Sequence, residues 1–115
     1  MTLFPGFAIV SVPFPFTDRQ AKKRRPALVI SVAKYQQSAG HILLAMITSA
    51  EHSSWPFDWR IKELEGTGLS MPCLIRLKLF SLDQRLILNQ LGQLSALDQQ
   101  GVCDQLKALL AEPQR

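Results

Sequence analysis

Prolines divide the first third of this chain into two apolar runs separated by a polar segment. The runs Phe7–Val12 and Ala27–Val32 are rich in branched aliphatic residues, which predicts a half-buried strand followed by a buried one. Between them, Pro13–Phe16 cannot continue a central ladder, because proline lacks the backbone N–H donor, and Thr17–Arg24 is a polar loop. The chain must therefore leave the sheet after its first strand and return to it near Pro26.

Further short extended segments follow, with turn residues such as Ser38–Gly40 between them. Leu77 and Leu79 share one face of the longest segment, and Arg76 and Lys78 share the other, which is the alternation of a strand. The segments are His41–Thr48, Asp58–Leu64 (an edge strand or a short helix), Met71–Leu82, and Leu86–Leu91 (a strand or a connecting element). Short strands with turns between them predict a small β-barrel.

A helix is predicted after Ser95, which can serve as its N-cap with Asp98 three residues on. Gly101 weakens this helix by about 1 kcal/mol relative to alanine, and Pro113 ends it. The apolar stripe of the helix consists of Val102, Leu106, Leu109 and Leu110.

Length and composition narrow the class of protein. A chain of 115 residues that is 47% hydrophobic can form one domain, 1–115, with its own core. Cys73 and Cys103 form no CxxC motif, so we expect free thiols, a reducing cytoplasm and no structural zinc. The longest apolar run has only strand length, which predicts no membrane span.

The basic residues are concentrated in the first loop. Five of the thirteen lysines and arginines fall between Arg19 and Arg25, and the net charge is +4. Clustered cations favour a polyanion, because binding releases the counterions condensed on phosphates. We expect Lys22, Lys23 and Arg24 to steer a nucleic-acid backbone, whereas a solvated basic face is the simpler alternative.

Several catalytic classes lack their motifs. His41 and His52 have no HExxH or acidic cluster beside them, no GxSxG or phosphate-binding glycine loop is present, and Cys73 lies in an apolar setting. What remains is a cation and a hydroxyl. Arg25 precedes Pro26, which biases its backbone to an extended conformation at the mouth of a strand, and Thr48 ends another strand. A fixed guanidinium with a hydroxyl can stabilise the charge of a reacting phosphate.

Three aromatic residues lie in or beside the second loop, Ser49–Phe57. Exposed aromatic rings next to cations can stack on unpaired bases. Such rings can also close one end of a barrel core or form a dimer surface, and we prefer this structural interpretation for Trp59. The three residues are Trp55, Phe57 and Trp59.

These residues together resemble the PemK/MazF-like toxins of bacterial toxin–antitoxin systems. RPALV followed downstream by ITS is a specific combination, although either piece alone is weak. The resemblance follows the family's order over nearly the whole chain. Its motifs are Gly6, VPFPFTD (12–18), RRPALVIS (24–31), MITS (46–49), Gly68-Leu69 with Pro72, IRLKLFSLD (75–83) and LGQLS (91–95).

The resemblance implies an SH3-like β-barrel of the PemK/MazF/CcdB type with a C-terminal helix. It implies a metal-independent, cofactor-free endoribonuclease that cuts single-stranded RNA through attack of the 2′-hydroxyl, with an antitoxin partner and a homodimer as its assembly. The family's catalytic arginine and threonine fall on Arg25 and Thr48, and the second cation of some members falls on Arg76. The residues expected to contact RNA are Arg19, Lys22, Lys23, Arg24, Ser49, Trp55 and Lys78.

The chain departs from the family at two positions. Many members carry an acidic residue where this chain has Phe7, and some carry a proton-transferring aspartate where it has Lys78. The general base is therefore unassigned, with Asp18 and Glu51 as the candidate substitutes. An alternative is therefore a non-cleaving SH3-like module that binds nucleic acid or protein. A gyrase-binding toxin on the same barrel is disfavoured, because the segment AEPQR (111–115) carries no aromatic residue.

Overall fold

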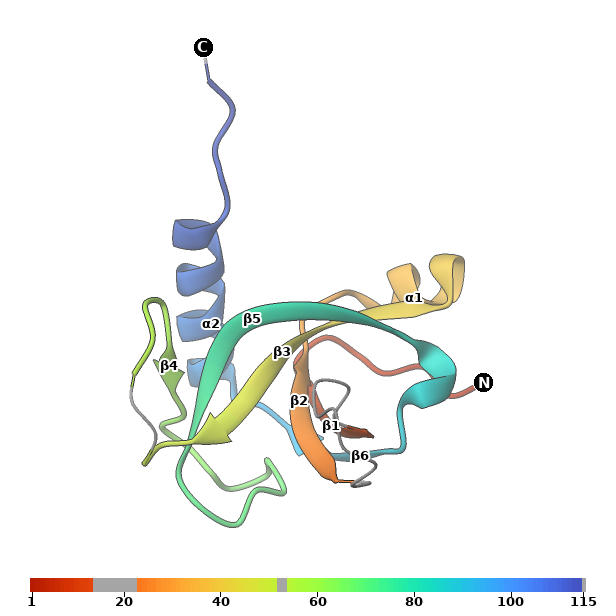
Figure 1. Cartoon of the computed structure of the whole chain (residues 1–115), viewed down its shortest axis with the longest axis horizontal. Coiled ribbons are helices and arrows are strands. Elements are labelled where there is room, and N and C mark those ends of the chain that lie inside the picture. Colours follow the sequence, from red (N-terminus) through yellow and green to blue (C-terminus); the bar gives the residue numbers. More distant parts are fainter. Residues whose placement is uncertain (14–22, 52–53, 115) are drawn as a thin grey trace.

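The computed structural model describes residues 1–13, 23–51 and 54–114. Its centre is a six-stranded antiparallel sheet in the order β4-β5-β3-β2-β1-β6, curved into a half-barrel (Figure 1). The predicted β-barrel class with a C-terminal helix is thus confirmed. The strands are β1 (Ala8–Pro13), β2 (Arg24–Val29), β3 (His41–Ser49), β4 (Trp59–Arg60), β5 (Cys73–Asp83) and β6 (Asn89–Gln93).

The first two strands lie where the N-terminal apolar runs predicted them, with shifted ends. β1 includes Pro13, which pairs with Arg24, and β2 ends at Val29 rather than at Val32. β2 begins at Arg24 rather than at Ala27, because Pro26 is accommodated opposite Ser11 of β1. On its other side, the ladder of β2 with β3 runs only from Ala27, opposite Met46, to Val29. Proline cannot donate to a ladder, so the pairing of β2 with β3 stops at Pro26.

β5 is the longest strand and arches across the molecule (Figure 1). Its pairing with β3 shifts at a bulge, where Ala45 faces Leu79 and the next residue, Met46, faces Arg76. Leu77 and Leu79 pack against the core cluster that contains Ile75, whereas Lys78 is exposed, which confirms the predicted alternation. The bulge lets one long strand serve two cores, since bulges bend the strand that carries them.

Those two cores lie on opposite faces of the curved sheet. The first cluster includes Ile9, Leu28 and Ile75, and the second includes Val10 and Leu44. Neighbouring residues of β1 enter different clusters because side chains alternate along a strand. β1 is therefore buried on both faces rather than half-buried as predicted, which explains why its alternation is weak in the sequence.

A short helix, α1 (Ala33–Ala39), was not predicted by the sequence, which indicated only the turn that ends it. Gly40 forms that turn, with a φ of 71° and its N–H donated to the carbonyl of Gln36. The buried residue of α1 is Gln36, whose side chain binds the backbone of Thr2 and Phe4 and the side chain of Gln84. Because α1 buries an amide side chain rather than apolar residues, its sequence lacks the hydrophobic periodicity from which a helix is predicted.

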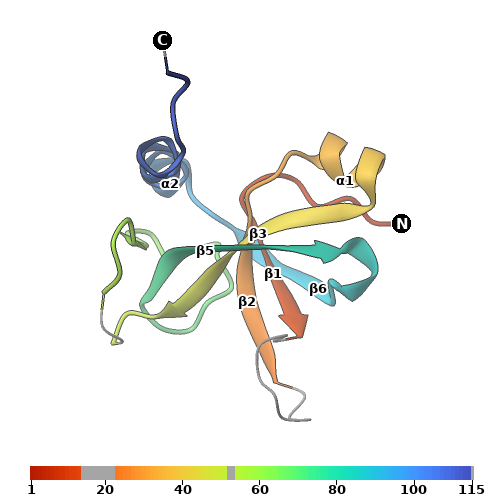
Figure 2. The same cartoon turned by 45° about the horizontal axis from the view of Figure 1, so that its top comes forward.

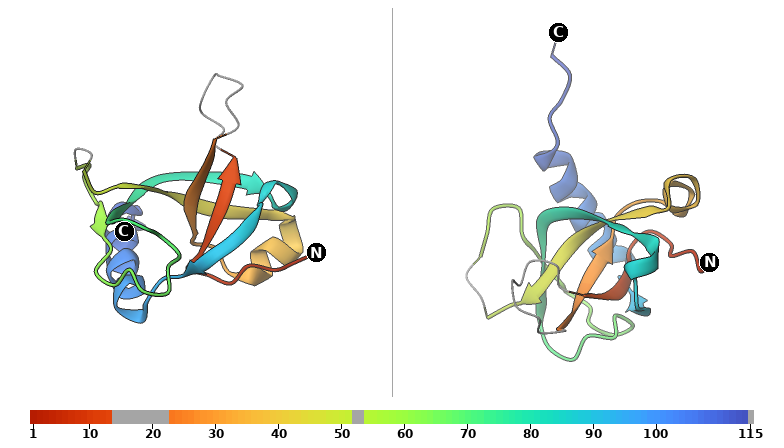
Figure 3. Two further views of the ribbon diagram at one scale, coloured as in Figure 1. Left: turned by 90° about the horizontal axis from the view of Figure 1, so that it is seen from below. Right: turned by 45° about the vertical axis from the view of Figure 1, so that its right-hand side comes forward.

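The segment predicted as a strand or connecting element at Leu86–Leu91 is divided. A 3-10 turn, η1, covers Gln84–Leu86, and β6 starts at Asn89. β6 meets the chain after β4, where the N–H of Gln93 donates to the carbonyl of Gly66. Gly92 is required there, because a Cβ on it would lie 2.3 Å from that carbonyl oxygen. This contact joins β6, at one edge of the sheet, to the loop that follows β4, the strand at the other edge (Figure 3).

The C-terminal helix, α2 (Ala96–Leu109), has the predicted N-cap, because the Ser95 hydroxyl accepts from the Asp98 N–H. α2 and α1 lie at opposite ends of the sheet (Figure 2). The predicted apolar stripe is only half right. Val102 is buried and Leu106 packs on the core, but Leu109 and Leu110 are exposed because α2 extends beyond the sheet that covers its first turns (Figure 1). Neither helix of the described chain combines the length and the apolar character needed to cross a membrane.

Trp59 packs against α2, as the core interpretation predicted. Its indole Nε1 donates to Asp98, and the ring lies directly over Gly101. The expectation that Gly101 merely weakens the helix is incomplete, because a Cβ at this position would lie 2.2 Å from the Trp59 ring. Gly101 is the residue that allows strand β4 and helix α2 to approach.

Gly101→Ala should therefore destabilise the protein although alanine is the better helix former. We expect the free energy of unfolding to fall by about 1–3 kcal/mol, since overpacking outweighs a propensity gain of about 1 kcal/mol. Urea unfolding measures the change, with the exposed Gln100→Ala on the same helix as control. A variant as stable as the wild type would contradict the close packing.

Candidate active site

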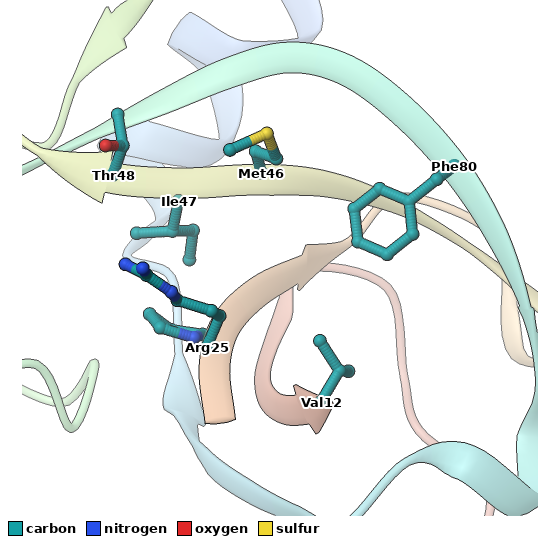
Figure 4. A pocket seen from close by; sticks show the side chains of 7 residues that line it. Val12, Arg25, Met46, Ile47, Thr48 and Phe80 are labelled. Carbon is teal, nitrogen blue, oxygen red and sulfur yellow. The ribbon is translucent and has the colours of Figure 1, made fainter. Parts of the chain in front are cut away.

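Arg25 and Thr48 come together where β2 and β3 separate. Ala27 of β2 pairs with Met46 of β3. The strands are antiparallel, so two residues further along this register Arg25 lies opposite Thr48, on the same face of the sheet. The Arg25 side chain extends from β2 toward the end of β3 that carries Thr48 (Figure 4). The ladder between β2 and β3 ends at Ala27 and Met46, so the two side chains border an open space rather than a closed sheet.

Two adjoining pockets occupy that space, and both are lined by Arg25, Pro26, Ile47 and Thr48. The first, of about 200 Å³, extends toward Val12, Met46 and Phe80 and is mainly apolar (Figure 4). The second, of about 250 Å³, extends toward Ser49, Ser70 and Met71. Arg25 and Thr48 thus line both pockets and lie where the two adjoin.

A second group of predicted residues gathers on β5. The Arg76 guanidinium binds Asp58 through two hydrogen bonds, from Nε to Oδ1 at 3.2 Å and from Nη2 to Oδ2 at 3.0 Å. The Trp55 ring lies against two cations, with its centroid 5.3 Å from Arg76 Cζ and 4.8 Å from Lys78 Nζ. Arg76, Trp55 and Lys78 are therefore neighbours, which the sequence alone did not indicate.

The sheet connects the two groups. Arg76 pairs with Met46, and Met46 is two residues before Thr48 on β3, so these side chains share one face. Met46 also lines the apolar pocket beside Arg25. One face of β2, β3 and β5 consequently carries Arg25, Thr48 and Arg76 in neighbouring positions.

The remaining predicted contacts have different settings. Lys23 and Arg24 are exposed at the start of β2. Ser49 lines the second pocket, and its hydroxyl accepts from the Glu51 N–H at 3.2 Å. Arg19, Lys22, Asp18 and His52 lie outside the described residues.

The structure shows what became of the two departures from the family. Phe7 packs against the first core cluster, and its N–H donates to the carbonyl of Val29. Val29 is at the other end of β2 from Arg25, so the family's acidic residue at position 7 would lie away from this site. Lys78 adds a cation beside Trp55. Glu51 is exposed in the turn after β3. The carboxylate that binds Arg76 is Asp58, which sequence reasoning missed.

Other chemistry is less well supported. Burial raises the pKa of the Cys73 thiol, and its Sγ donates to the Met71 carbonyl, which agrees with the predicted inert cysteine. Over residues 1–13, 23–51 and 54–114, no three His, Cys, Asp or Glu side chains gather where they could hold a metal ion. The arrangement offers hydroxyl and guanidinium groups, which together can bind and stabilise an anion.

The fold and the site define a small barrel with a cationic groove between splayed strands, and comparison with known proteins identifies its class. A family model described as PemK-like, MazF-like toxin of type II toxin–antitoxin system matches residues 6–110. The chain therefore belongs to the PemK/MazF-like toxin family, as its motifs suggested.

Solved structures support the same fold. MazF from Deinococcus radiodurans superposes with a TM-score of 0.74 at 25% sequence identity, covering 95% of this chain and 97% of that one. A MazE–MazF complex from the same organism gives 0.75 at 24% identity, covering 98% and 100%. An endoribonuclease in complex with its cognate antitoxin, from a mycobacterial species, gives 0.71 at 12% identity, covering 98% and 100%. No curated protein sequence matches the chain.

Proposed function

We propose that this toxin is a metal-independent endoribonuclease that cuts single-stranded RNA at the Arg25–Thr48 groove. The 2′-oxygen attacks the adjacent phosphorus, the bond from phosphorus to the 5′-oxygen breaks, and the products are a 2′,3′-cyclic phosphate and a 5′-hydroxyl. The 2′-hydroxyl loses its proton, and the departing 5′-oxygen gains one, so the reaction consumes no cofactor.

The observation that carries this proposal is the pairing of a guanidinium and a hydroxyl on either side of an open groove in a member of this toxin family. Arg25 would stabilise the charge that builds up on the phosphoryl oxygens, where a preorganised donor is most effective. Thr48 would orient the same phosphate through its hydroxyl. Arg76, one strand away, would supply a second positive charge.

The surrounding residues suit the rest of an RNA strand. Lys23, Arg24 and Lys78 are exposed cations that can follow the backbone, together with Arg19 and Lys22, and Ser49 lies in the second pocket. The exposed Trp55 ring can stack on an unpaired base, as aromatic residues do in RNA-binding proteins. These contacts would set affinity and register rather than perform the reaction.

The proposal extends to partners. Because the family pairs each toxin with an antitoxin, and relatives have been solved as MazE–MazF complexes, we propose a cognate antitoxin as inhibitor. A disordered acidic segment would suit the cationic groove. We propose that the toxin itself acts as a homodimer in the cytoplasm.

The decisive experiment incubates the purified protein with a long single-stranded RNA in EDTA and maps the ends. We expect discrete cuts with cyclic-phosphate and 5′-hydroxyl ends. Thr48→Val keeps the side-chain shape and removes the hydroxyl, so its cleavage rate should fall about 100-fold, the usual cost of one preorganised donor. Thr48→Ser, which restores a hydroxyl, is the matched control.

Each opposite result has a defined meaning. An unchanged rate for Thr48→Val would make this residue structural. Cleavage that stops in EDTA would refute the metal-independent mechanism. RNA that binds without being cut would leave the non-cleaving binding module as the function of this barrel.

A further inference from the structure

The Asp58 carboxylate joins the turn that contains it to Arg76 on β5, eighteen residues later in the chain. Its two oxygens hold the Arg76 guanidinium at 3.2 and 3.0 Å, and only 7% of its side chain is exposed. The Arg76 side chain is 10% exposed, so the pair is shielded from water and from salt. Two parallel bonds fix orientation as well as distance.

The same carboxylate fixes the turn that presents Trp55. The Trp55 N–H donates to Asp58 Oδ2 at 2.7 Å, and the Asp58 N–H donates to the Trp55 carbonyl at 3.2 Å. Pro56 and Phe57 form the tip of this four-residue turn, and Phe57 has a φ of 67°. A bulky residue with positive φ is strained and persists only when its surroundings hold it, and the bonds to Asp58 provide that restraint.

The Trp55 side chain is held but not covered. Arg76 and Lys78 lie against the ring, yet 46% of the residue is exposed. A ring that serves only as packing would be buried, whereas a fixed and exposed indole offers a face to a planar ligand. Since Arg76 pairs with Met46 beside the Arg25–Thr48 groove, a base stacked here would belong to an RNA strand that crosses that groove.

We propose that Asp58 is a positioning residue that, anchored on Arg76, holds the Trp55 indole in place to stack an unpaired base of the RNA. This inference deepens the proposed function and rests on it. Asp58 touches neither the reacting phosphate nor the base, and it acts through the turn. Its negative charge opposes RNA binding, so its benefit must come from geometry.

The charge of Asp58 and its positioning role therefore predict opposite changes in the Kd for RNA. Electrostatics alone predicts that Asp58→Asn tightens RNA binding, because a negative charge beside the groove is removed. The positioning role predicts the reverse, a Kd about tenfold higher, because the loosened turn loses base stacking. In a Trp55→Ala background, Asp58→Asn should not weaken binding further.

The experiment measures the Kd of a fluorescent single-stranded RNA in EDTA by anisotropy, with 2′-deoxy substitution at any nucleotide that the wild type cuts. Asp104→Asn, an exposed carboxylate on α2, is the matched control and should not raise the Kd. Asp58→Glu keeps the charge beside Arg76 and serves if Asp58→Asn fails to fold by circular dichroism. Its longer side chain should misplace the turn and also raise the Kd.

The outcomes separate this inference from the proposed activity. A weaker affinity that depends on Trp55 supports the positioning role, whether or not the wild type cuts the RNA. Folded Asp58 variants that bind as tightly as the wild type, or that lose affinity equally without Trp55, overturn it. A wild-type protein that does not bind RNA overturns both proposals, whereas binding without cleavage overturns only the ribonuclease.

Discussion

Arg25→Ala should abolish RNA cleavage while the protein keeps its fold. Arg25 borders both pockets, and we propose that its guanidinium faces the phosphate on which charge develops. Removing an arginine that stabilises such a charge costs about 10³- to 10⁵-fold in rate in other phosphoryl-transfer enzymes. The measurement is single-turnover cleavage of a defined RNA in EDTA, with circular dichroism to verify folding.

The chain offers a close control for this prediction. Arg24 is the adjacent residue of β2, carries the same charge and is exposed. Arg24→Ala should weaken RNA binding modestly at low salt and leave the rate of the bound complex nearly unchanged. If Arg24→Ala and Arg25→Ala lowered the cleavage rate equally, the loss would reflect the total positive charge. Arg25 would then not be a catalytic residue.

Asp98→Ala should lower the free energy of unfolding more than Gly101→Ala does. The Asp98 carboxylate is fully buried and accepts from four donors, with distances of 2.8 to 3.0 Å. Without it, these donors remain buried and unpaired, which should cost about 3–5 kcal/mol, a large part of the stability of a small domain. The donors are the Trp59 indole, the Lys62 and Glu63 N–H groups and the Ser95 hydroxyl.

The same carboxylate predicts a dependence on pH. Burial alone would raise the pKa of Asp98, but the hydrogen bonds from Lys62, Trp59, Glu63 and Ser95 outweigh it and lower the pKa below its usual value. The stabilisation is therefore complete above the unfolded pKa of about 3.9 and is lost as the pH falls through the folded pKa. Urea unfolding from pH 7 to pH 2 should show this loss in the wild type.

Two comparisons test the assignment of this effect to Asp98. Asp104→Ala, on the exposed side of the same helix, should change the stability by no more than about 0.5 kcal/mol at neutral pH. Asp98→Ala should flatten the acid branch of the curve. An Asp98→Ala protein as stable as the wild type would mean that its four donors find other partners.

The elements predicted best are those with a strong local signal. β1, β3, β5 and the capped helix α2 follow from apolar alternation and from Ser95, with shifts of one or two residues at their ends. α1 was not predicted because its buried residue is the polar Gln36, whose hydrogen-bond partners lie in other segments. Gly101 was misjudged because its role depends on Trp59, a contact across the fold.

The site shows the same division. Arg25 and Thr48 were predicted as site residues at strand ends, and the register of β2 with β3 places them opposite each other. Asp58 was missed because its importance comes from Arg76, eighteen residues later. A Pro-Phe-Asp turn before a short strand is a common loop signal, and only the folded chain shows what its carboxylate holds.

The strand order also has a consequence for how quickly the toxin folds. β1 must find β6, with Ala8 opposite Gln93, and the half-barrel is completed only when those segments meet. Such distant pairings slow folding, because the entropy of closing a long loop is lost before any contact compensates for it. β2, β3 and β5, which carry the proposed catalytic face, can associate over shorter loops. The groove can therefore take shape early in folding, while the edge that stabilises it is added late.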